Sequence, residues 1–403
     1  MCLVLSIKLI TVDYQLDFLS LLLREGQQLT KYCAHRITLT NILWKIFKFL
    51  LFETLLWDQI LLLFMKPGIS PDYLIYGAGA IGSVLGAFLH KIGRRVTYAG
   101  RGEHFRIFSE KGLRITGIWG EHIVPAQETE ILSSLLLKKQ FSIILLCVKS
   151  KDTDVAALDA ASRLKEGGIM VSMQNGLNNW EVIARQVGED RTVGGRVIFG
   201  AEILDPGHAK VTVNADDVLL GEPFLPVNQR LLQALSEDLS LSGIPCRIVS
   251  KDEIWAAIWG KVLYNCSLNP LGALLEVAYG KLGENAETTG IIKVIIEEIF
   301  LVMKAKGVAV PYQDADEYYH YLLERQLPPT AGHRASMLQD ILLGRQTEID
   351  ALNGAISLYA RAYGISTPYN DLLTALIKFK EKKKAFSSIP DYYYQECETI
   401  GRE

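Results

Sequence analysis

From Tyr73 onward the chain alternates short apolar runs with amphipathic segments, a pattern that predicts strands and helices in turn. The run Tyr73–Tyr76 leads into a glycine-rich turn, and Arg95–Ala99 is predicted as a second strand after Gly93. Between them, apolar residues recur at helical spacing, at Val84, Leu85, Phe88 and Leu89. The pattern therefore predicts a strand, a helix and a second strand in close succession.

Two continuous apolar runs further along predict strands that are buried on both faces of a sheet. They are Phe141–Val148 and Gly168–Met173, and polar residues follow each of them. Such strands are typical of a parallel sheet covered by helices. Residues 193–220 contain strand patterns around a Pro-Gly turn, which we interpret as an extension of the sheet. We predict one α/β domain over residues 71–250.

After Ser250 the spacing of apolar residues becomes that of helices separated by Gly and Pro. The predicted helices are 252–268, 284–306, 312–326, 332–343, 347–363 and 368–382. Pro270 is expected to end or kink the first of them, and Thr347 is an expected start of the fifth. We predict an all-α domain over residues 251–380, followed by a polar tail over 381–403.

The first 70 residues are rich in Leu, Ile and Phe and contain little turn punctuation. Their most apolar stretch, Phe49–Met65, would be about 25 Å long as a helix, against about 30 Å for a hydrocarbon core. Its apolar residues favour insertion by about 6 kcal/mol, and Glu53 with Asp58 oppose insertion by about the same. Three interpretations follow: an interfacial or partner-binding helix, a marginal anchor, or an upstream stretch not needed for the fold. We favour the last, because Met65 stands just before a clean strand.

Composition and charge exclude some classes of function. Charged residues make up 22% of the chain and the formal net charge is -3, so nothing points to nucleic acid. The cysteines show no spacing typical of a metal site, and several lie in apolar runs. Buried, reduced thiols are typical of the cytosol. We therefore expect a cytoplasmic protein without a metal and without membrane attachment.

The glycine-rich turn has the spacing Gly-x-Gly-x-x-Gly, over Gly77, Ala78, Gly79, Ala80, Ile81 and Gly82. Between a strand and a helix this spacing predicts a Rossmann-type site, where glycines allow a tight turn and a close approach to a pyrophosphate. NAD-preferring sites place an acid at the end of the second strand. Here the chain has Arg101 and no acid before Glu103, which favours NADP(H) with Arg101 at the 2′-phosphate. The alternative is a solvated cation at a strand end.

Two polar residues follow the predicted buried strands. Lys149 comes directly after the first, and Asn175 follows the second. In an open parallel sheet, ligands collect outside the carboxyl ends of the strands. Either residue alone could belong to a turn. Together with the glycine loop they predict contacts near the nicotinamide half of a cofactor.

The first helix of the second domain carries a polar stripe on a mostly apolar segment. Lys261, Asn265 and Asn269 recur every four residues and therefore share one face. A solvated lysine with two amides bound to nearby backbone would be the ordinary explanation. The residues around the stripe leave little polar face for it: Trp255, Ile258, Trp259, Val262, Leu263 and Leu268. We predict instead that a partly buried Lys261 donates a proton to a carbonyl oxygen.

Ser336 and Glu348 flank the Gly-Arg break between two predicted helices, which makes both of them candidate site residues. Asp340, Asp350 and several arginines stand near the same break. For most of these we prefer helix-end electrostatics and structural ion pairs.

The motifs GAGAIG, VKS, QNG, KVLYNCSLNPLGAL, RASMLQD and GRQTEID follow one another over about residues 72–376. In this order they resemble the ketopantoate reductase (2-dehydropantoate 2-reductase) family. The resemblance implies reduction of 2-dehydropantoate to pantoate with NADPH, on the route to pantothenate and coenzyme A. It also implies a helical domain like that of 6-phosphogluconate dehydrogenase-like enzymes.

The resemblance further implies a role for each matching residue. Lys261 would be the proton donor, and Glu348 would contact the cofactor and help to set the state of the lysine. The substrate contacts would be Asn175, Asn265, Asn269 and Ser336. Further cofactor contacts would be Lys149 and Asn175.

One position departs from the family pattern. Tyr279 precedes Gly-x-Leu where an asparagine is expected, which changes the size and hydrogen bonding of one pocket wall. A related NADP-dependent 2-hydroxy acid dehydrogenase of the mandelate type is therefore the first alternative. A non-catalytic NADPH-binding regulator and a membrane-tethered interaction protein built on the first 70 residues are the others. We expect a small-molecule 2-oxo acid as ligand and a homodimer as a candidate assembly.

Overall fold

The computed structural model describes residues 70–132 and 139–386 of the chain. The described residues all belong to one compact unit. The first 69 residues, and with them the segment Phe49–Met65, lie outside the described part of the chain. Within the described part of the chain, no helix is both long enough and apolar enough to cross a membrane.

Eight strands form one sheet in the order β12-β11-β8-β7-β6-β1-β2-β5. Neighbouring strands are parallel except β8 and β11. The strands are β1 (Tyr73–Tyr76), β2 (Val96–Ala99), β5 (Glu130–Ile131), β6 (Phe141–Leu146), β7 (Leu164–Ser172), β8 (Thr192–Arg196), β11 (Val218–Gly221) and β12 (Cys246–Val249). From β5 to β8 this is the doubly wound order of a dinucleotide-binding sheet, with its switch point between β1 and β6. The predicted α/β class is confirmed.

Alternating side chains of the central strands feed two separate cores, one on each face of the sheet. On β1, Ile75 joins one core and Leu74 the other. The first face is covered by α3 (Ala80–Lys91) and α7 (Gln229–Ser242), and the second by α5 (Thr153–Ala161) and α6 (Asn179–Val187). Because both faces are covered, these strands are apolar throughout, as the continuous runs in the sequence indicated.

A second, smaller sheet has the order β4-β3-β10-β9. Its strands are β3 (Leu113–Gly117), β4 (His122–Val124), β9 (Phe199–Asp205) and β10 (His208–Asn214), and α4 (Gly102–Lys111) precedes β3. The prediction that all of residues 193–220 extend the main sheet is therefore wrong for the β9–β10 hairpin. Aromatic packing explains its position, because the Trp119 ring lies 5.0 Å from Phe199 and 5.6 Å from Phe88 of α3.

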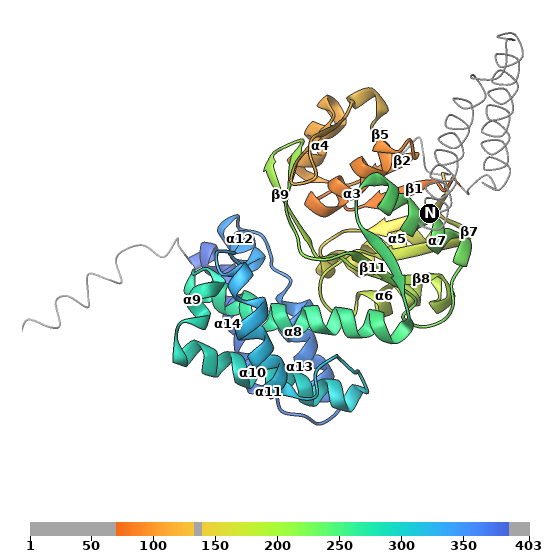
Figure 1. Cartoon of the computed structure of the whole chain (residues 1–403). Helices are drawn as coiled ribbons and strands as arrows, with labels where there is room; N and C mark the ends of the chain where they lie inside the picture. Colours follow the sequence, from red (N-terminus) through yellow and green to blue (C-terminus); the bar gives the residue numbers. More distant parts are fainter. Residues whose placement is uncertain (1–69, 133–138, 387–403) are drawn as a thin grey trace, which may run out of the picture. The chain divides into compact units, whose positions relative to one another are not determined.

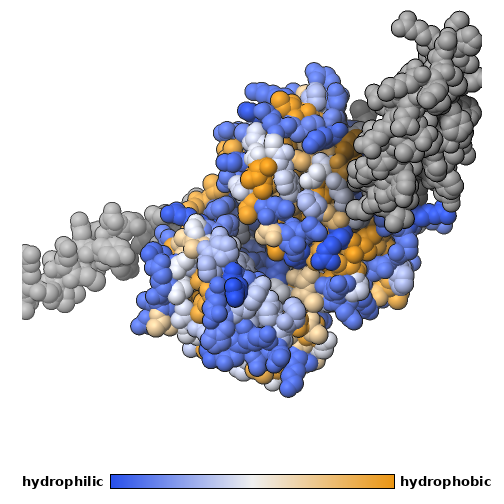
Figure 2. All heavy atoms as spheres, viewed as in Figure 1, coloured by the Kyte–Doolittle hydropathy of each residue, from blue (hydrophilic) through white to orange (hydrophobic). Residues whose placement is uncertain are grey.

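The region after β12 is helical, and its core also contains Leu177, Trp180 and Leu219 from the sheet region. Its helices are α8 (Lys251–Leu275), α9 (Tyr279–Gly283), α10 (Ala286–Lys306), α11 (Ala315–Tyr321), α12 (Ser336–Leu342), α13 (Asn353–Ala362) and α14 (Pro368–Phe386). Figure 1 shows the long helix α8 running from beside β8 and β11 into this helical region. The face in Figure 2 is largely hydrophilic, with apolar residues in separate patches.

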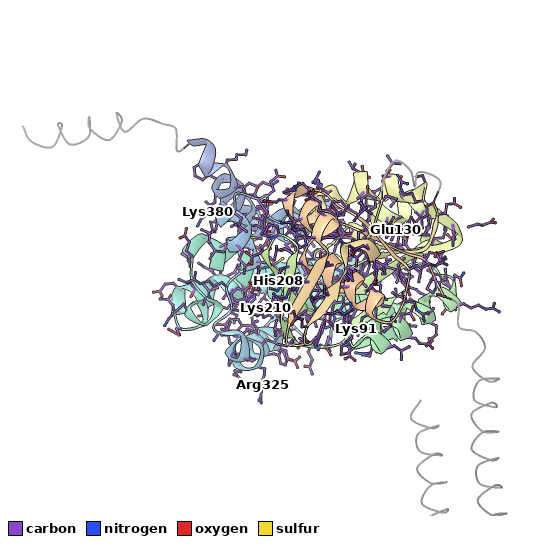
Figure 3. All side chains as sticks on the ribbon, turned by 90° about the horizontal axis from the view of Figure 1, so that it is seen from above. Lys91, Glu130, His208, Lys210, Arg325 and Lys380 are labelled. Carbon is purple, nitrogen blue, oxygen red and sulfur yellow. The ribbon has the colours of Figure 1, made fainter. Side chains whose placement is uncertain are left out.

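Both ends of α8 are capped by side chains. At its start, Ser250 and Glu253 form a capping box, each accepting a hydrogen bond from the other's backbone N–H. At its end, the Lys380 ammonium donates to the carbonyl oxygens of Ala273 and Leu274, at 2.7 and 3.2 Å. A cation at a helix C-terminus is favourable, and Lys380 (Figure 3) thereby ties α14 to α8.

The prediction that Pro270 ends or kinks α8 near that residue is wrong for the ending, because the helix continues to Leu275. A proline has no N–H, so the carbonyl of Cys266 loses its usual helical donor. The buried Asn353 side chain replaces that donor, with Nδ2 3.2 Å from the Cys266 oxygen. A side chain from α13 thus allows the helix to pass through the proline.

Thr347 does not begin a helix either. The chain forms a single short turn, Ile349–Ala351, and α13 begins only at Asn353. The Thr347 hydroxyl accepts a hydrogen bond from the Ile349 N–H at 3.2 Å and donates to Glu381 at 2.6 Å. The threonine caps that turn, because its side chain bonds the backbone two residues on.

Candidate active site

The glycine loop between β1 and α3 has three glycines with three different reasons to be there. Gly77 has φ +106° and an added Cβ would lie 2.5 Å from the Val148 nitrogen. A Cβ on Gly82 would lie 2.2 Å from the Gly77 oxygen, so Gly82 serves the packing of α3 and does not line the cleft. A Cβ on Gly79 would meet nothing within 4 Å. The open side at Gly79, beside the N–H groups at the start of α3, fits a pyrophosphate.

Arg101 follows β2 at the place expected for a residue that selects the cofactor. Its guanidinium is 81% exposed and donates to Asp152 Oδ2 at 2.8 Å. The Lys151 ammonium lies 3.3 Å from the other oxygen of the same carboxylate. All three line the cleft that contains the glycine loop. Two cations therefore share one carboxylate at this end of the cleft.

One large cleft runs from the glycine loop to helices α8 and α12. Apart from Gly82, every residue predicted for the site lines it: Gly77, Ala78, Gly79, Ala80, Ile81, Arg101, Lys149, Asn175, Lys261, Asn265, Asn269, Ser336 and Glu348. Residues that are far apart in the sequence thus meet in one cavity, with the sheet region on one side and the helical region on the other.

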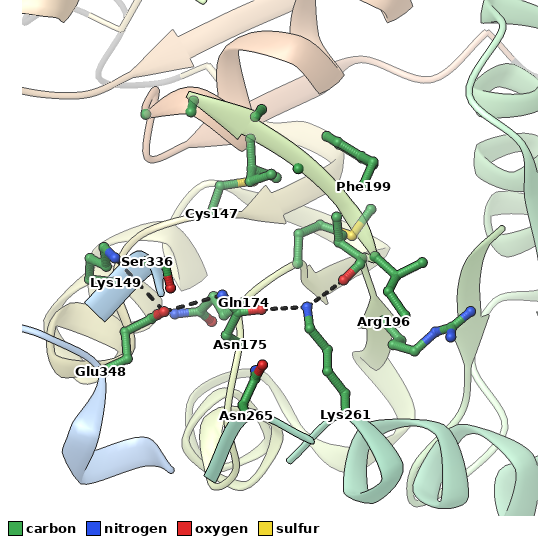
Figure 4. A pocket seen from close by; sticks show the side chains of 18 of the residues that line it. Cys147, Lys149, Gln174, Asn175, Arg196, Phe199, Lys261, Asn265, Ser336 and Glu348 are labelled. Atoms are coloured by element: carbon green, nitrogen blue, oxygen red, sulfur yellow. Dashed lines mark hydrogen bonds and ion pairs between the residues drawn. The ribbon is translucent and has the colours of Figure 1, made fainter. Parts of the chain in front are cut away.

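The Lys261 ammonium reaches from α8 across the cleft to the loops that follow β7 and β8 (Figure 4). It donates to Asn175 Oδ1 at 2.5 Å and to the carbonyl oxygen of Val197. An ammonium has three N–H donors, so its contacts with the described residues leave one N–H for a ligand. Burial lowers the pKa of Lys261 to about 8; Glu348 opposes this shift and Arg196 adds to it.

Glu348 does not contact Lys261 directly. Its Oε2 accepts a hydrogen bond from Asn175 Nδ2 at 3.2 Å, and Asn175 in turn accepts from Lys261 (Figure 4). Lys149 lies 3.8 Å from the same Oε2 and donates to Asp340 at 2.8 Å. Burial would lower the pKa of Lys149, but the carboxylates of Glu348 and Asp340 outweigh it and raise that pKa. A continuous polar chain therefore links Lys149 to Lys261.

The loop that carries Asn175 is held by side chains beneath it. The backbone oxygen of Asn175 accepts hydrogen bonds from Ser150 Oγ at 2.8 Å and Asn179 Nδ2 at 2.9 Å. Gln174 donates to the Val148 oxygen at 3.0 Å, which joins this loop to the one after β6. Such supporting bonds hold the side chain of Asn175 between Lys261 and Glu348.

The remaining predicted residues lie around the lysine. Asn265 is one turn further along α8, and its side chain makes no hydrogen bond to another described residue. Asn269 is buried, and its Oδ1 accepts a hydrogen bond from the Tyr279 hydroxyl. Ser336 is exposed at the first position of α12. The stripe predicted on α8 therefore faces the cleft.

Arg196, at the end of β8, is a cleft residue that the sequence patterns did not indicate. It is 7% exposed, and its Nη2 donates to Asp216 at 2.7 Å and to the Asp217 oxygen at 2.8 Å. Its one sequence signal is a charged residue at the end of an apolar strand. The structural ion pair predicted for Asp340 is confirmed, with Lys149 and also with Arg345 at 3.1 Å.

Comparison with known proteins identifies the family. The family model described as "Ketopantoate reductase PanE/ApbA" matches residues 73–223. The model described as "Ketopantoate reductase PanE/ApbA C terminal" matches residues 253–381. This chain belongs to the ketopantoate reductase family. Curated relatives named 2-dehydropantoate 2-reductase agree with this. The protein from Aquifex aeolicus is 36% identical over 77% of this chain and 96% of its own length, and that from Pyrococcus horikoshii is 32% identical over 76% and 96%.

Solved structures of similar fold include ketopantoate reductases and a dehydrogenase. A PanE/ApbA family ketopantoate reductase from Ralstonia eutropha JMP134 is 26% identical, with a TM-score of 0.68 over 78% of this chain and 99% of that one. D-mandelate dehydrogenase with NADH and anilino(oxo)acetate is 28% identical, with a TM-score of 0.69 over 77% and 99%. The likeness to the ketopantoate reductase therefore spans both the sheet and the helical regions.

Proposed function

We propose that this ketopantoate reductase family member reduces a 2-oxo acid, 2-dehydropantoate, to the 2-hydroxy acid pantoate with NADPH. One observation carries the proposal: Lys261 lies in the cleft with two of its N–H groups held by Asn175 and Val197. Its pKa, lowered to about 8 by burial, is close to the operating range of a proton donor. The curated relatives named 2-dehydropantoate 2-reductase suggest the substrate.

When bound, NADPH supplies the hydride, and the protein supplies binding, orientation and the proton. Negative charge then develops on the substrate's carbonyl oxygen and needs a donor beside it. In our proposal the third N–H of Lys261 donates to that oxygen and the proton is transferred as the alcohol forms. Asn175 keeps the ammonium in place, and Glu348 behind it favours the protonated lysine because its charge raises the lysine pKa.

The other polar residues of the cleft would bind the two ligands. Asn265, Asn269 and Ser336 would hold the carboxylate and hydroxyl oxygens of the substrate, because they line the cleft around Lys261. The glycine loop would hold the pyrophosphate and Arg101 the 2′-phosphate. Lys149 and Glu348 would meet the nicotinamide end.

The free thiols of the described cysteines support a cytoplasmic location.

Replacement of Lys261 tests the proposal. We expect Lys261→Ala to lower kcat for 2-dehydropantoate by about 100-fold or more, because a positioned acid contributes that much. NADPH binding, followed by cofactor fluorescence, should be nearly unchanged. Lys251→Ala is a matched control on the same helix, since Lys251 lies outside the cleft and donates to the Phe224 oxygen. Near-normal turnover by Lys261→Ala would overturn the proposal.

A second candidate function is reduction of a bulkier, aromatic 2-oxo acid. Tyr279 lines the cleft together with Tyr264 and His333, and D-mandelate dehydrogenase has a similar structure. A panel that compares 2-dehydropantoate with phenylglyoxylate, each with NADPH and NADH, would separate the two activities. The panel should use the full chain and a version that begins at Met65. Tight NADPH binding without turnover of any acid would instead favour a non-catalytic regulator.

A further inference from the structure

Tyr279 begins α9 and forms part of the wall of the cleft opposite the sheet region. The ring is 2% exposed, with the Tyr264 ring 5.9 Å away and the His333 ring 5.3 Å away. The Tyr279 N–H also donates to the His333 carbonyl oxygen at 3.0 Å. Ring and backbone are thus both fixed, so the position of the Tyr279 hydroxyl is fixed as well.

The Tyr279 hydroxyl donates to Oδ1 of Asn269, the third residue of the polar stripe on α8. Burial raises the pKa of Tyr279, so the phenol keeps its proton. A buried hydroxyl needs an acceptor for that proton. Among the described residues Asn269 Oδ1 is the acceptor that it has. This fixes the orientation of the amide, because the opposite orientation would leave the phenol proton without an acceptor.

The amide nitrogen of Asn269 is left to the cleft. No described residue accepts a hydrogen bond from Nδ2, and the nitrogen is not closed off from solvent. Lys261 and Asn265 lie on the same face of α8, two turns and one turn before it. With its carbonyl oxygen occupied by Tyr279, Asn269 presents N–H donors alone. This end of the cleft therefore offers donors that an oxygen atom of the substrate can satisfy.

We propose that Tyr279 is a positioning residue for substrate selectivity: by holding the Asn269 carbonyl, it makes this subsite select a 2-oxo acid with an oxygen acceptor on the chain beyond the keto group. The inference rests on the proposed function and names the group that is recognised. A hydroxyl on the fourth carbon, as in 2-dehydropantoate, provides such an oxygen. An analogue with a methyl group there displaces solvent from the Asn269 N–H groups and offers them no acceptor, which disfavours its binding.

A matched pair of substrates tests this inference. 2-Dehydropantoate and 3,3-dimethyl-2-oxobutanoate differ in the hydroxyl on the fourth carbon. We expect the wild-type chain to favour the first by about tenfold or more in kcat/KM, because a polar site rejects an analogue that lacks the polar group. Tyr279→Phe frees the Asn269 amide to turn, so the preference should fall to within a few-fold. The fall should come from a higher KM for 2-dehydropantoate, with kcat nearly kept.

Tyr264→Phe is the control, because it also removes a hydroxyl from this wall of the cleft. That hydroxyl donates to Thr330 Oγ1 at 2.8 Å and does not bond an amide of the polar stripe. It should leave the ratio between the two acids unchanged. An equal loss of preference in both variants, or no loss in Tyr279→Phe, would overturn the inference.

A binding measurement separates this inference from the proposed function. Titration calorimetry with NADP+ present compares pantoate with 2-hydroxy-3,3-dimethylbutanoate, which lacks the second hydroxyl. Tighter binding of pantoate to the wild-type chain than to Tyr279→Phe supports the inference even if turnover is slow. Equal binding of the two acids by the wild-type chain refutes it, whereas absence of turnover alone refutes the proposed function.

Discussion

The protonation of Lys261 should set how the reaction depends on pH. Burial lowers its pKa from 10.5 to about 8. Reduction needs the protonated lysine as donor, so kcat/KM for the 2-oxo acid should be level below pH 8 and fall above it. Oxidation of the 2-hydroxy acid needs the neutral lysine as acceptor, so its kcat/KM should rise up to about pH 8. The pH profiles of kcat/KM for reduction and for oxidation should therefore bend at the same pH with opposite slopes.

The size of the effect follows from the pKa. With a pKa of about 8, roughly nine tenths of the molecules carry protonated Lys261 at pH 7, and about one tenth at pH 9. The rate of reduction should thus fall about tenfold between these values. Glu348 raises the pKa of Lys261, so Glu348→Gln should move the bend to lower pH.

The assay follows NADPH absorbance at saturating cofactor and low 2-oxo acid, because kcat/KM for the acid reports groups of the enzyme form that binds the acid. The ionic strength is held constant across the pH range, so that screening of charges does not change with pH. Residual activity of Lys261→Ala should show no bend near pH 8. A bend near pH 10.5, as for an exposed lysine, or the same bend in Lys261→Ala, would refute the reasoning.

Three further predictions concern stability and cofactor choice. Between pH 8 and 10.5 the unfolded chain holds more protons on Lys261 than the folded chain does. The free energy of unfolding of the wild-type chain, measured in urea relative to Lys261→Met, should therefore rise by about 3 kcal/mol over this pH range. A difference that does not change with pH would contradict this. Asp152→Asn removes the carboxylate that pairs with Arg101, so NADPH should bind several-fold more tightly in fluorescence titrations while NADH does not. An equal change in affinity for both cofactors would count against this prediction. Asn353→Ala should lower the free energy of unfolding by about 1–3 kcal/mol. The loss should be smaller in a Pro270→Ala background, where the backbone N–H of residue 270 is present again. Equal losses in the two backgrounds would show that Asn353 does not stand in for that N–H.

The sequence was sufficient where a signal is local. The glycine loop, the strand that ends before Lys149 and the loop with Asn175 depend on spacing within short segments, and the structure brings them to one edge of the sheet. The stripe from Lys261 to Asn269 was likewise visible, because helical periodicity alone places its members on one face.

Features that depend on distant partners were not predictable in the same way. The β9–β10 hairpin leaves the main sheet because of contacts with β3 and α3, and nothing within the hairpin sequence indicates them. Arg196 becomes a cleft residue only through the position of β8, and its partner Asp216 is supplied by the segment before β11. The hydroxyl of Tyr279 was expected to change the pocket, but only the fold shows that Asn269 receives it.

The proline within α8 also constrains how this protein can change over generations. Pro270 and Asn353 are far apart in the sequence, yet the asparagine supplies the donor that the proline removes. Loss of the asparagine first leaves a buried carbonyl unpaired, whereas loss of the proline first restores the backbone donor and makes the asparagine less necessary. Substitutions at the two positions should therefore be tolerated in one order and selected against in the other. Among descendants of this fold, the asparagine should persist wherever the proline does.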